Sequence, residues 1–198
     1  MILTHKGHTP QIHPTAYVAP TATVCGQVTL GPACRILHGA QVIAEGGSIE
    51  LGEACIILEN AVIRSTARHA TVIGNFCLVG PNAHLVGCLV EDEVFIATGA
   101  AIFHGARLGK GSEVRINAVV HLRSHLPAGA FVPIGWVAVG DPIQILSPDQ
   151  HDKIWELQQP LNFPGFVYGI ERAELTMEKL TRGLAATLAD HRDDTLVP

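Results

Sequence analysis

Charged and aromatic side chains are both scarce in this sequence. Asp, Glu, Lys and Arg make up 16% of its 198 residues, and Phe, Trp and Tyr make up 5%. A formal net charge of −5 without a Lys/Arg run argues against a nucleic-acid-binding surface. No apolar run reaches membrane-spanning length, and the first six residues lack the apolar stretch of a signal peptide. We therefore expect a cytoplasmic protein without nucleic-acid or membrane partners.

Cysteine pairs of the metal-binding or redox type are also missing. The five cysteines are an odd number, and no two of them are spaced as CxxC. This usage argues against a disulfide framework or a cysteine zinc site. We expect the cysteines to be reduced and to behave as small hydrophobic residues in the core.

An aliphatic residue recurs at every sixth position along most of the chain. The series runs from Ile12 to Val132, with insertions near residues 46–48 and 65–72, and all twenty of its members are Ile, Val or Leu. A period of six fits neither an α-helix nor an alternating strand, whose periods are 3.6 and 2. It is typical of a hexapeptide-repeat parallel β-helix, in which three short strands make one coil. Residues 1–146 are therefore predicted to form an all-β solenoid of about seven coils.

The last quarter of the chain has a different pattern, and residues 147–198 are predicted to form α-helices that pack on the β-helix. Ser147 and Pro148 suggest the cap and first position of a short helix that ends near Gln158. A second, amphipathic helix is predicted over residues 170–191, where leucines recur at near-helical spacing. Residues 193–198 are expected to be frayed.

Two segments carry a family resemblance. Residues 73–88 read IGNFCLVGPNAHLVGC, and residues 57–64 read ILENAVIR. They resemble the patterns I-G-x-x-x-x-V-G-H-x-x-x-L-H-G-C and I-Q-D-x-S-V-I-H of the gamma-class carbonic anhydrase family. The resemblance extends from about residue 12 to residue 146. It implies a left-handed β-helix, a homotrimer, and a zinc ion held between neighbouring subunits by three histidines.

The chain departs from this family at the metal site. The resemblance places the three zinc ligands at Arg64, Pro81 and Val86, none of which can replace an imidazole. Glu59 stands where the family has Asp, and Glu45 where its R-G-D segment has Asp. Because a zinc hydratase needs three protein ligands and an open position, no zinc and no other cofactor is predicted. Hydration of CO2 by the family mechanism is not expected.

The resemblance also places Glu59 and Arg64 beside the former metal pocket, on columns that face one another across the subunit interface. Two interpretations remain open. The two residues form an interface ion pair, or Arg64 holds the carboxylate or phosphate of a small anionic ligand while Glu59 or His84 moves a proton. Arg64, Glu59 and His84 are thus the candidate ligand-binding residues, and Glu59 and His84 the candidate catalytic ones.

Several alternatives remain. A purely structural or assembly role is one, so the sequence leaves open whether the protein is an enzyme. Another is a hexapeptide-repeat acyltransferase that uses acyl-CoA, with His69 or His104 as general base. A third is a rewired metal site that contains His84, His104 or His121. The histidines at positions 5, 8 and 13 are expected to be surface residues.

Overall fold

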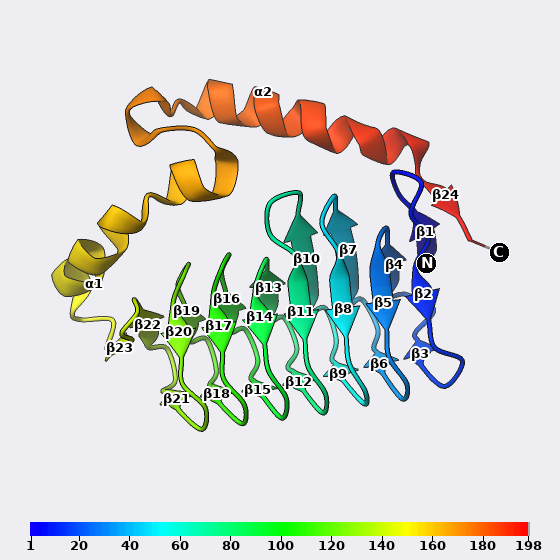
Figure 1. The fold of residues 1–198 in the computed structure, drawn as a ribbon, viewed down its shortest axis with the longest axis horizontal. Helices are drawn as coiled ribbons and strands as arrows, with labels where there is room; N and C mark the ends of the chain where they lie inside the picture. The colour runs from blue at the N-terminus through cyan, green and yellow to red at the C-terminus, as the bar shows by residue number, and fades with distance from the viewer. Residues whose placement is uncertain (198) are drawn as a thin grey trace.

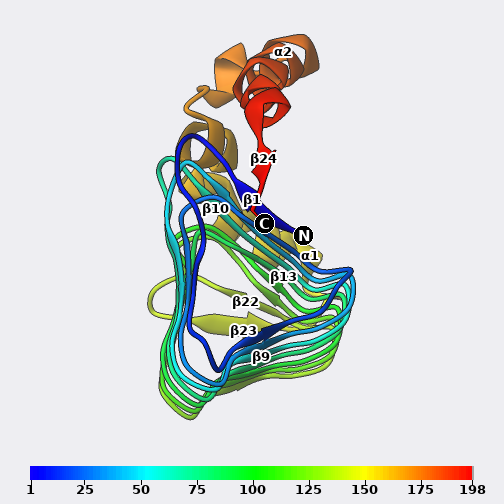
Figure 2. The same cartoon turned by 90° about the vertical axis from the view of Figure 1, so that its right-hand side faces the viewer.

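Three parallel sheets wind into a left-handed β-helix in the computed structural model, which describes residues 1–197. The end view shows a triangular cross-section, with one sheet along each side (Figure 2). Two sheets contain seven strands each, and the third has eight parallel strands flanked by one antiparallel strand at each end. The predicted solenoid and its approximate number of coils are confirmed.

The strands are short, as six-residue repeats require. The ten-stranded sheet contains β1 (Ile2–Thr4), β4 (Thr23–Cys25), β7 (Gln41–Glu45), β10 (Val62–Thr66), β13 (His84–Val86), β16 (Ala101–Ile102), β19 (Val119–Val120), β22 (Val137–Val139), β23 (Gln144–Leu146) and β24 (Thr195–Leu196). The second sheet contains β2 (Gln11–Ile12), β5 (Val28–Leu30), β8 (Ile49–Leu51), β11 (Thr71–Ile73), β14 (Leu89–Val90), β17 (Arg107–Leu108) and β20 (His125–Leu126). The third contains β3 (Tyr17–Val18), β6 (Arg35–Ile36), β9 (Ile56–Ile57), β12 (Leu78–Val79), β15 (Phe95–Ile96), β18 (Glu113–Val114) and β21 (Phe131–Val132).

The aliphatic residues of the repeat stack directly on one another along the axis. Val42, Ile63 and Leu85, for example, are register partners on successive coils and are completely buried. All five cysteines are buried and free, as expected. Each thiol of Cys34 and Cys55 lies within 3.0 Å of a backbone carbonyl of the next coil. The narrow core is therefore filled by one large aliphatic side chain per strand and small residues at the corners.

The longer insertion forms a short hairpin between β10 and β11. Thr66 and His69 exchange two backbone hydrogen bonds, of 2.9 and 3.0 Å, and close the turn. Gly87 on the next coil lies under this hairpin with a φ of +59°, and a Cβ atom there would lie 2.5 Å from that of His69. Glycine at position 87 therefore lets the hairpin lie directly against the coil below.

Two α-helices follow the β-helix, and both begin later than predicted. Helix α1 (His151–Gln158) ends at the predicted residue, but its cap is Gln150, without a side-chain hydrogen bond. Ser147 is instead the first residue of a turn, where its carbonyl accepts a hydrogen bond from Gln150 N at 3.0 Å. Ile154 of α1 packs on Val139 and Leu146, so the helix covers the C-terminal end of the β-helix.

Helix α2 (Met177–Leu188) is shorter than the predicted segment 170–191. It begins at Met177 because Leu175 is extended and the Thr176 side chain accepts a hydrogen bond from Lys179 N at 3.1 Å. The connecting chain forms short helical turns, namely η1 (Gln159–Leu161), η2 (Pro164–Tyr168) and η3 (Arg172–Glu174), and η4 (Ala189–Asp193) follows α2. Figure 1 shows α2 running back along the β-helix toward the N-terminus. Within residues 1–197, no helix is long and apolar enough to cross a membrane.

The C-terminal residues are paired rather than frayed, which corrects the expectation from the sequence. Strand β24 pairs antiparallel with β1, and Leu196 lies opposite Leu3. The two ends of the chain therefore lie close together, as Figure 1 shows. The physical reason is that β1 is an outermost strand, whose unpaired backbone groups accept another strand. Pro198 lies outside the described residues.

Candidate functional site

A groove of about 530 Å³ separates the first sheet from the C-terminal segment. One wall consists of side chains from β7, β10, β13 and the turn after β16, and the other comes from η2 and α2. Its lining residues are Glu45, Arg64, Thr66, Ala67, Arg68, His84, Val86, Phe103, His104, Phe163, Val167, Tyr168, Ile170, Leu180, Gly183, Leu184, Thr187 and Leu188. The groove therefore has a polar wall with cationic and imidazole groups and a largely apolar wall.

Arg64 and Glu45 form the ion pair at the polar wall. Arg64 Nη2 donates a hydrogen bond of 2.7 Å to Glu45 Oε1, and only 9% of the Glu45 side chain is exposed. The second partner of Glu45 is His191, whose Nε2 lies 3.1 Å from each carboxylate oxygen. A guanidinium has five N–H groups, so the bond to Glu45 leaves donors for another acceptor in the groove.

Three histidines lie at or beside the groove, and all have lowered pKa values. Burial and, secondarily, the Arg64 charge lower the pKa of His84, and burial followed by Arg68 lowers that of His69. Burial and the nearby charges of His69, His84 and Arg64 lower the pKa of His104 to about 4. The His69 and His104 rings meet edge to face, with centroids 5.4 Å apart. At neutral pH the imidazoles are uncharged, and the arginines carry the positive charge.

The structure brings two of the three candidate ligand-binding residues together. Arg64 and His84 lie on neighbouring strands and line the same groove. Glu59 is exposed in the turn between β9 and β10, so it lies before the start of β10, whereas Arg64 lies within that strand. Within one chain Arg64 therefore pairs with Glu45 instead. A contact of Glu59 with Arg64 of a neighbouring copy stays a prediction.

The three residues that the resemblance places at the zinc-ligand positions offer no imidazole, thiolate or carboxylate. Arg64 and Val86 are register partners on β10 and β13, whereas Pro81 lies on a different surface of the chain. A guanidinium, an isopropyl group and a proline ring offer no zinc-binding atom of the kind proteins use. His84, His104 and His121 do not assemble into a group of three possible ligands within the described chain. These residues therefore do not fit a zinc ion.

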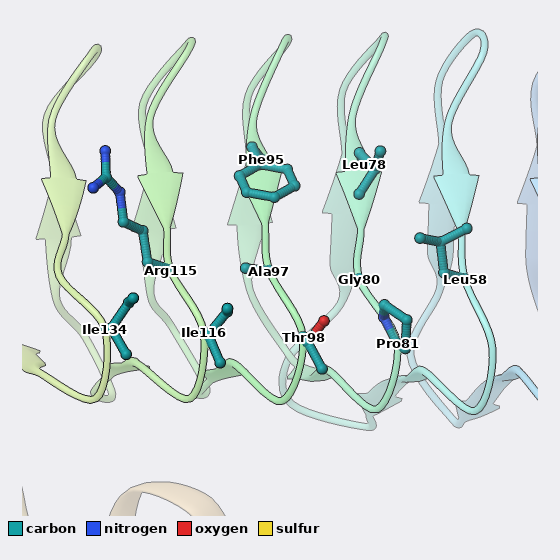
Figure 3. A pocket seen from close by; sticks show the side chains of 10 residues that line it. All are labelled: Leu58, Leu78, Gly80, Pro81, Phe95, Ala97, Thr98, Arg115, Ile116 and Ile134. Carbon is teal, nitrogen blue, oxygen red and sulfur yellow. The ribbon is translucent and has the colours of Figure 1, made fainter.

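Pro81 belongs to an apolar surface with a shallow pocket of about 440 Å³. Figure 3 shows that its side chains come from successive coils, with Pro81, Thr98, Ile116 and Ile134 in one row along a corner. The lining residues are Leu58, Leu78, Gly80, Pro81, Phe95, Ala97, Thr98, Arg115, Ile116 and Ile134. Phe95, Ile116 and Ile134 are 41%, 44% and 62% exposed. Large apolar side chains grouped in this way typically mark an interaction surface.

The sequence interpretation missed a second cluster of polar side chains. His5, expected at the surface, is only 2% exposed and lies against Asp194 and His191 from the other end of the chain. No local pattern connects residues 5 and 194. Glu45, in contrast, could be identified because it occupies a position where the resembling family has a carboxylate, one strand from Arg64.

Comparisons with known proteins support the resemblance. Gamma carbonic anhydrase 1, mitochondrial, from Arabidopsis thaliana is 32% identical over 126 residues, which cover 61% of this chain and 46% of that protein. The carnitine operon protein CaiE of Escherichia coli K12 is 28% identical over 109 residues, which cover 55% of this chain and 56% of that protein. This chain thus spans about half the length of these curated relatives. No family model matches.

Solved structures support the fold. The UDP-N-acetylglucosamine acyltransferase of Bacteroides fragilis has a TM-score of 0.58 and 16% identity, with 96% of this chain and 91% of that chain covered. A hexapeptide transferase family protein from Anaplasma phagocytophilum has a TM-score of 0.51 and 22% identity, with 95% and 97% covered. Both likenesses concern the fold alone.

Proposed function

We propose that this chain, a hexapeptide-repeat protein similar to the gamma-class carbonic anhydrases, is a homotrimer that binds a small anionic molecule beside Arg64. The observation that carries this proposal is the arginine at a zinc-ligand position of the family, paired on one side with a buried carboxylate and facing a groove on the other. Because the family's three ligand positions hold no zinc donor, CO2 hydration by the zinc mechanism is not part of the proposed function.

The two walls of the groove suggest a carboxylate or phosphate attached to an apolar body. The polar wall offers the Arg64 guanidinium, whose planar fork matches a carboxylate or phosphate. The opposite wall offers leucine side chains of α2, at positions 180, 184 and 188. An anion with a short hydrocarbon portion would satisfy the arginine and cover these side chains at the same time.

His84 is the candidate proton acceptor in this arrangement. Its lowered pKa keeps the imidazole neutral at pH 7, and it lies on the strand next to Arg64. A neutral imidazole beside a bound anion can accept a proton from the ligand or from water. Glu59 does not line the groove of its own chain, because it is exposed in the turn between β9 and β10. In the proposed trimer it reaches the groove of a neighbouring subunit.

Thermal-shift and calorimetric titrations test this proposal. We expect butyrate, octanoate or phosphate to raise the melting temperature of the wild-type chain in a dose-dependent way, since a ligand of the folded state stabilises it. Arg64→Gln should weaken binding by about 10- to 100-fold, the range expected for a lost hydrogen bond to a charged group of about 1.5–3 kcal/mol. Arg64→Lys, which keeps the charge without the fork, should lose part of the affinity.

Arg107→Gln is the matched control, because Arg107 is exposed on β17 of the second sheet and lines neither the groove nor the apolar surface. It should bind as the wild type does. Equal affinity in the Arg64 variants, with native circular dichroism, would contradict the proposed site. Stabilisation by acetyl-CoA but by none of the simple anions would instead favour acyl transfer, which at present has only the likeness of fold.

A further inference from the structure

We propose that His5, Cys25, His191 and Asp194 form a binding site for one zinc-class divalent metal ion, at the place where the two ends of the chain meet. We call these four residues the terminal cluster. One possible ligand atom from each residue lies within 4.8 Å of the others. His5 follows β1 and Cys25 ends β4, while His191 belongs to η4 and Asp194 precedes β24. This cluster does not include any of the family's zinc-ligand positions, 64, 81 and 86.

The distances within the terminal cluster are close to those of a tetrahedral site. Asp194 Oδ1 lies 2.6 Å from His5 Nδ1, and Asp194 Oδ2 lies 2.7 Å from His191 Nδ1 and 3.7 Å from Cys25 Sγ. Bond lengths of about 2.0–2.3 Å to zinc place neighbouring ligand atoms about 3.3–3.8 Å apart in a tetrahedron. The three Asp194 contacts therefore lie within about one ångström of tetrahedral spacing, and the ligand atoms of the other pairs lie within 4.8 Å of one another.

A second observation points to a missing ligand. The His5 side chain is 1% exposed, and its Nε2 has no hydrogen-bond partner among the described residues. A buried polar atom without a hydrogen-bond partner is unfavourable. Nδ1 is the His5 nitrogen that faces Asp194, so His5 offers both ring nitrogens only after its ring rotates, with Nε2 on the metal ion and Nδ1 still bonded to Asp194.

The surroundings of His191 are those of a metal-bound histidine. Its Nε2 faces Glu45, and Glu45 is in turn paired with Arg64. Metal-ligating histidines usually donate their second ring N–H to a carboxylate, which fixes the ring orientation. The Glu45 contact therefore leaves Nδ1 of His191 to face the metal. The same carboxylate connects the proposed metal site with the anion groove.

The donor types select the class of metal. Two imidazoles and a thiolate are typical of zinc and other borderline transition metals, whereas calcium and magnesium take oxygen ligands. Metal ions bind the thiolate form of cysteine and not the thiol. The thiol must therefore lose its proton to the solvent as the divalent ion binds. The thiolate and the Asp194 carboxylate together then balance the charge of the ion.

The test is a metal titration of the full chain after treatment with a chelator. Zinc should bind with a stoichiometry of one per chain in competition with a chromophoric chelator. Cobalt(II) should produce the sulfur-to-cobalt charge-transfer absorption of a thiolate ligand. Cys25→Ser should abolish this absorption and weaken zinc binding at least tenfold, and His191→Gln should weaken it as well.

Cys88→Ala is the matched control, since Cys88 is equally buried but lies outside the terminal cluster. It should keep both the absorption and the stoichiometry. Wild-type protein without zinc binding at micromolar concentration would overturn the proposal, as would cobalt absorption that persists in Cys25→Ser. Because the groove variants at Arg64 are assayed with anions and not with metals, failure of the metal site leaves the proposed anion site intact.

Discussion

Glu45 connects the two proposed sites through a single carboxylate. It accepts a hydrogen bond from Arg64 on the groove side and faces His191 on the side of the terminal cluster. A carboxylate that is only 9% exposed would be strongly unfavourable without such partners. Arg64 therefore has a structural role as well as the proposed ligand-binding role, and loss of its charge leaves a buried anion with one partner. This is why the Arg64→Lys variant is needed beside Arg64→Gln.

The pH dependence of stability should contain a contribution from His104. Its imidazole is 6% exposed, and burial followed by the nearby His69, His84 and Arg64 lowers its pKa from 6.5 to about 4. Below pH 6.5 the unfolded chain binds a proton that the folded chain does not, so this contribution to stability falls as the pH drops toward 4. Between pH 7 and pH 5, His104→Gln should lose about 2 kcal/mol less stability than the wild type.

Urea unfolding at the two pH values measures this difference. The comparison uses the change with pH rather than the stability itself, because a substitution at a buried position also alters packing. His125→Gln is the control, since His125 is exposed on β20. An unchanged pH dependence in His104→Gln would mean that folding leaves the pKa of His104 near its ordinary value.

At the scale of single elements, the strands were predictable and the starts of the helices were not. Each six-residue unit stacks its aliphatic residue on the equivalent residues of the previous and the next coil, so the sequence pattern repeats with the structure. The anchors from Ile12 to Val132 therefore predicted the coils. Ser147 and Thr176 are equally plausible caps by residue type, but only Thr176 caps a helix with its side chain, and α1 begins without a side-chain cap. The pairing of β1 with β24 joins strands of two or three residues and leaves no periodic pattern.

Substitutions of Thr176 and Ser147 test which of the two residues caps a helix. Thr176→Ala should remove the hydrogen bond to Lys179 N and destabilise the start of α2 by about 1 kcal/mol. Amide hydrogen exchange in the first turn of α2 should then be about five times faster. Ser147→Ala should leave exchange in α1 unchanged, because Gln150 and not Ser147 precedes that helix. Faster exchange in α1 after Ser147→Ala would show that the predicted cap forms in solution.

At the scale of the whole molecule, the C-terminal segment protects both ends of the first sheet. Strand β23 pairs antiparallel with β22 at one end, and β24 pairs antiparallel with β1 at the other. Helix α1 covers the last coil as well. Solenoids need such caps because an open outermost coil can pair with another chain. With the ends covered, association of copies is directed to the sides of the β-helix.

We propose that the apolar surface of Figure 3 is the trimer interface. One exposed apolar residue on this surface and one outside it, on consecutive strands of the chain, allow a test. Phe95 of β15 belongs to this surface and is 41% exposed, whereas Leu89 of β14, on the second sheet, is 39% exposed and outside it. In an isolated chain, an aspartate at either position should cost little, since surface substitutions usually change stability by about 0.5 kcal/mol or less.

In a trimer, an aspartate at position 95 would place an unpaired charge in the apolar interface, and this burial is strongly unfavourable. Light scattering after gel filtration should therefore give the wild type and Leu89→Asp three times the chain mass of 21.0 kDa. Phe95→Asp should elute as the 21.0 kDa monomer with native circular dichroism. A wild type that is monomeric at micromolar concentration would contradict the trimer. A trimeric Phe95→Asp would move the interface to another side, and then Glu59 of a neighbouring copy could not face Arg64 across this surface.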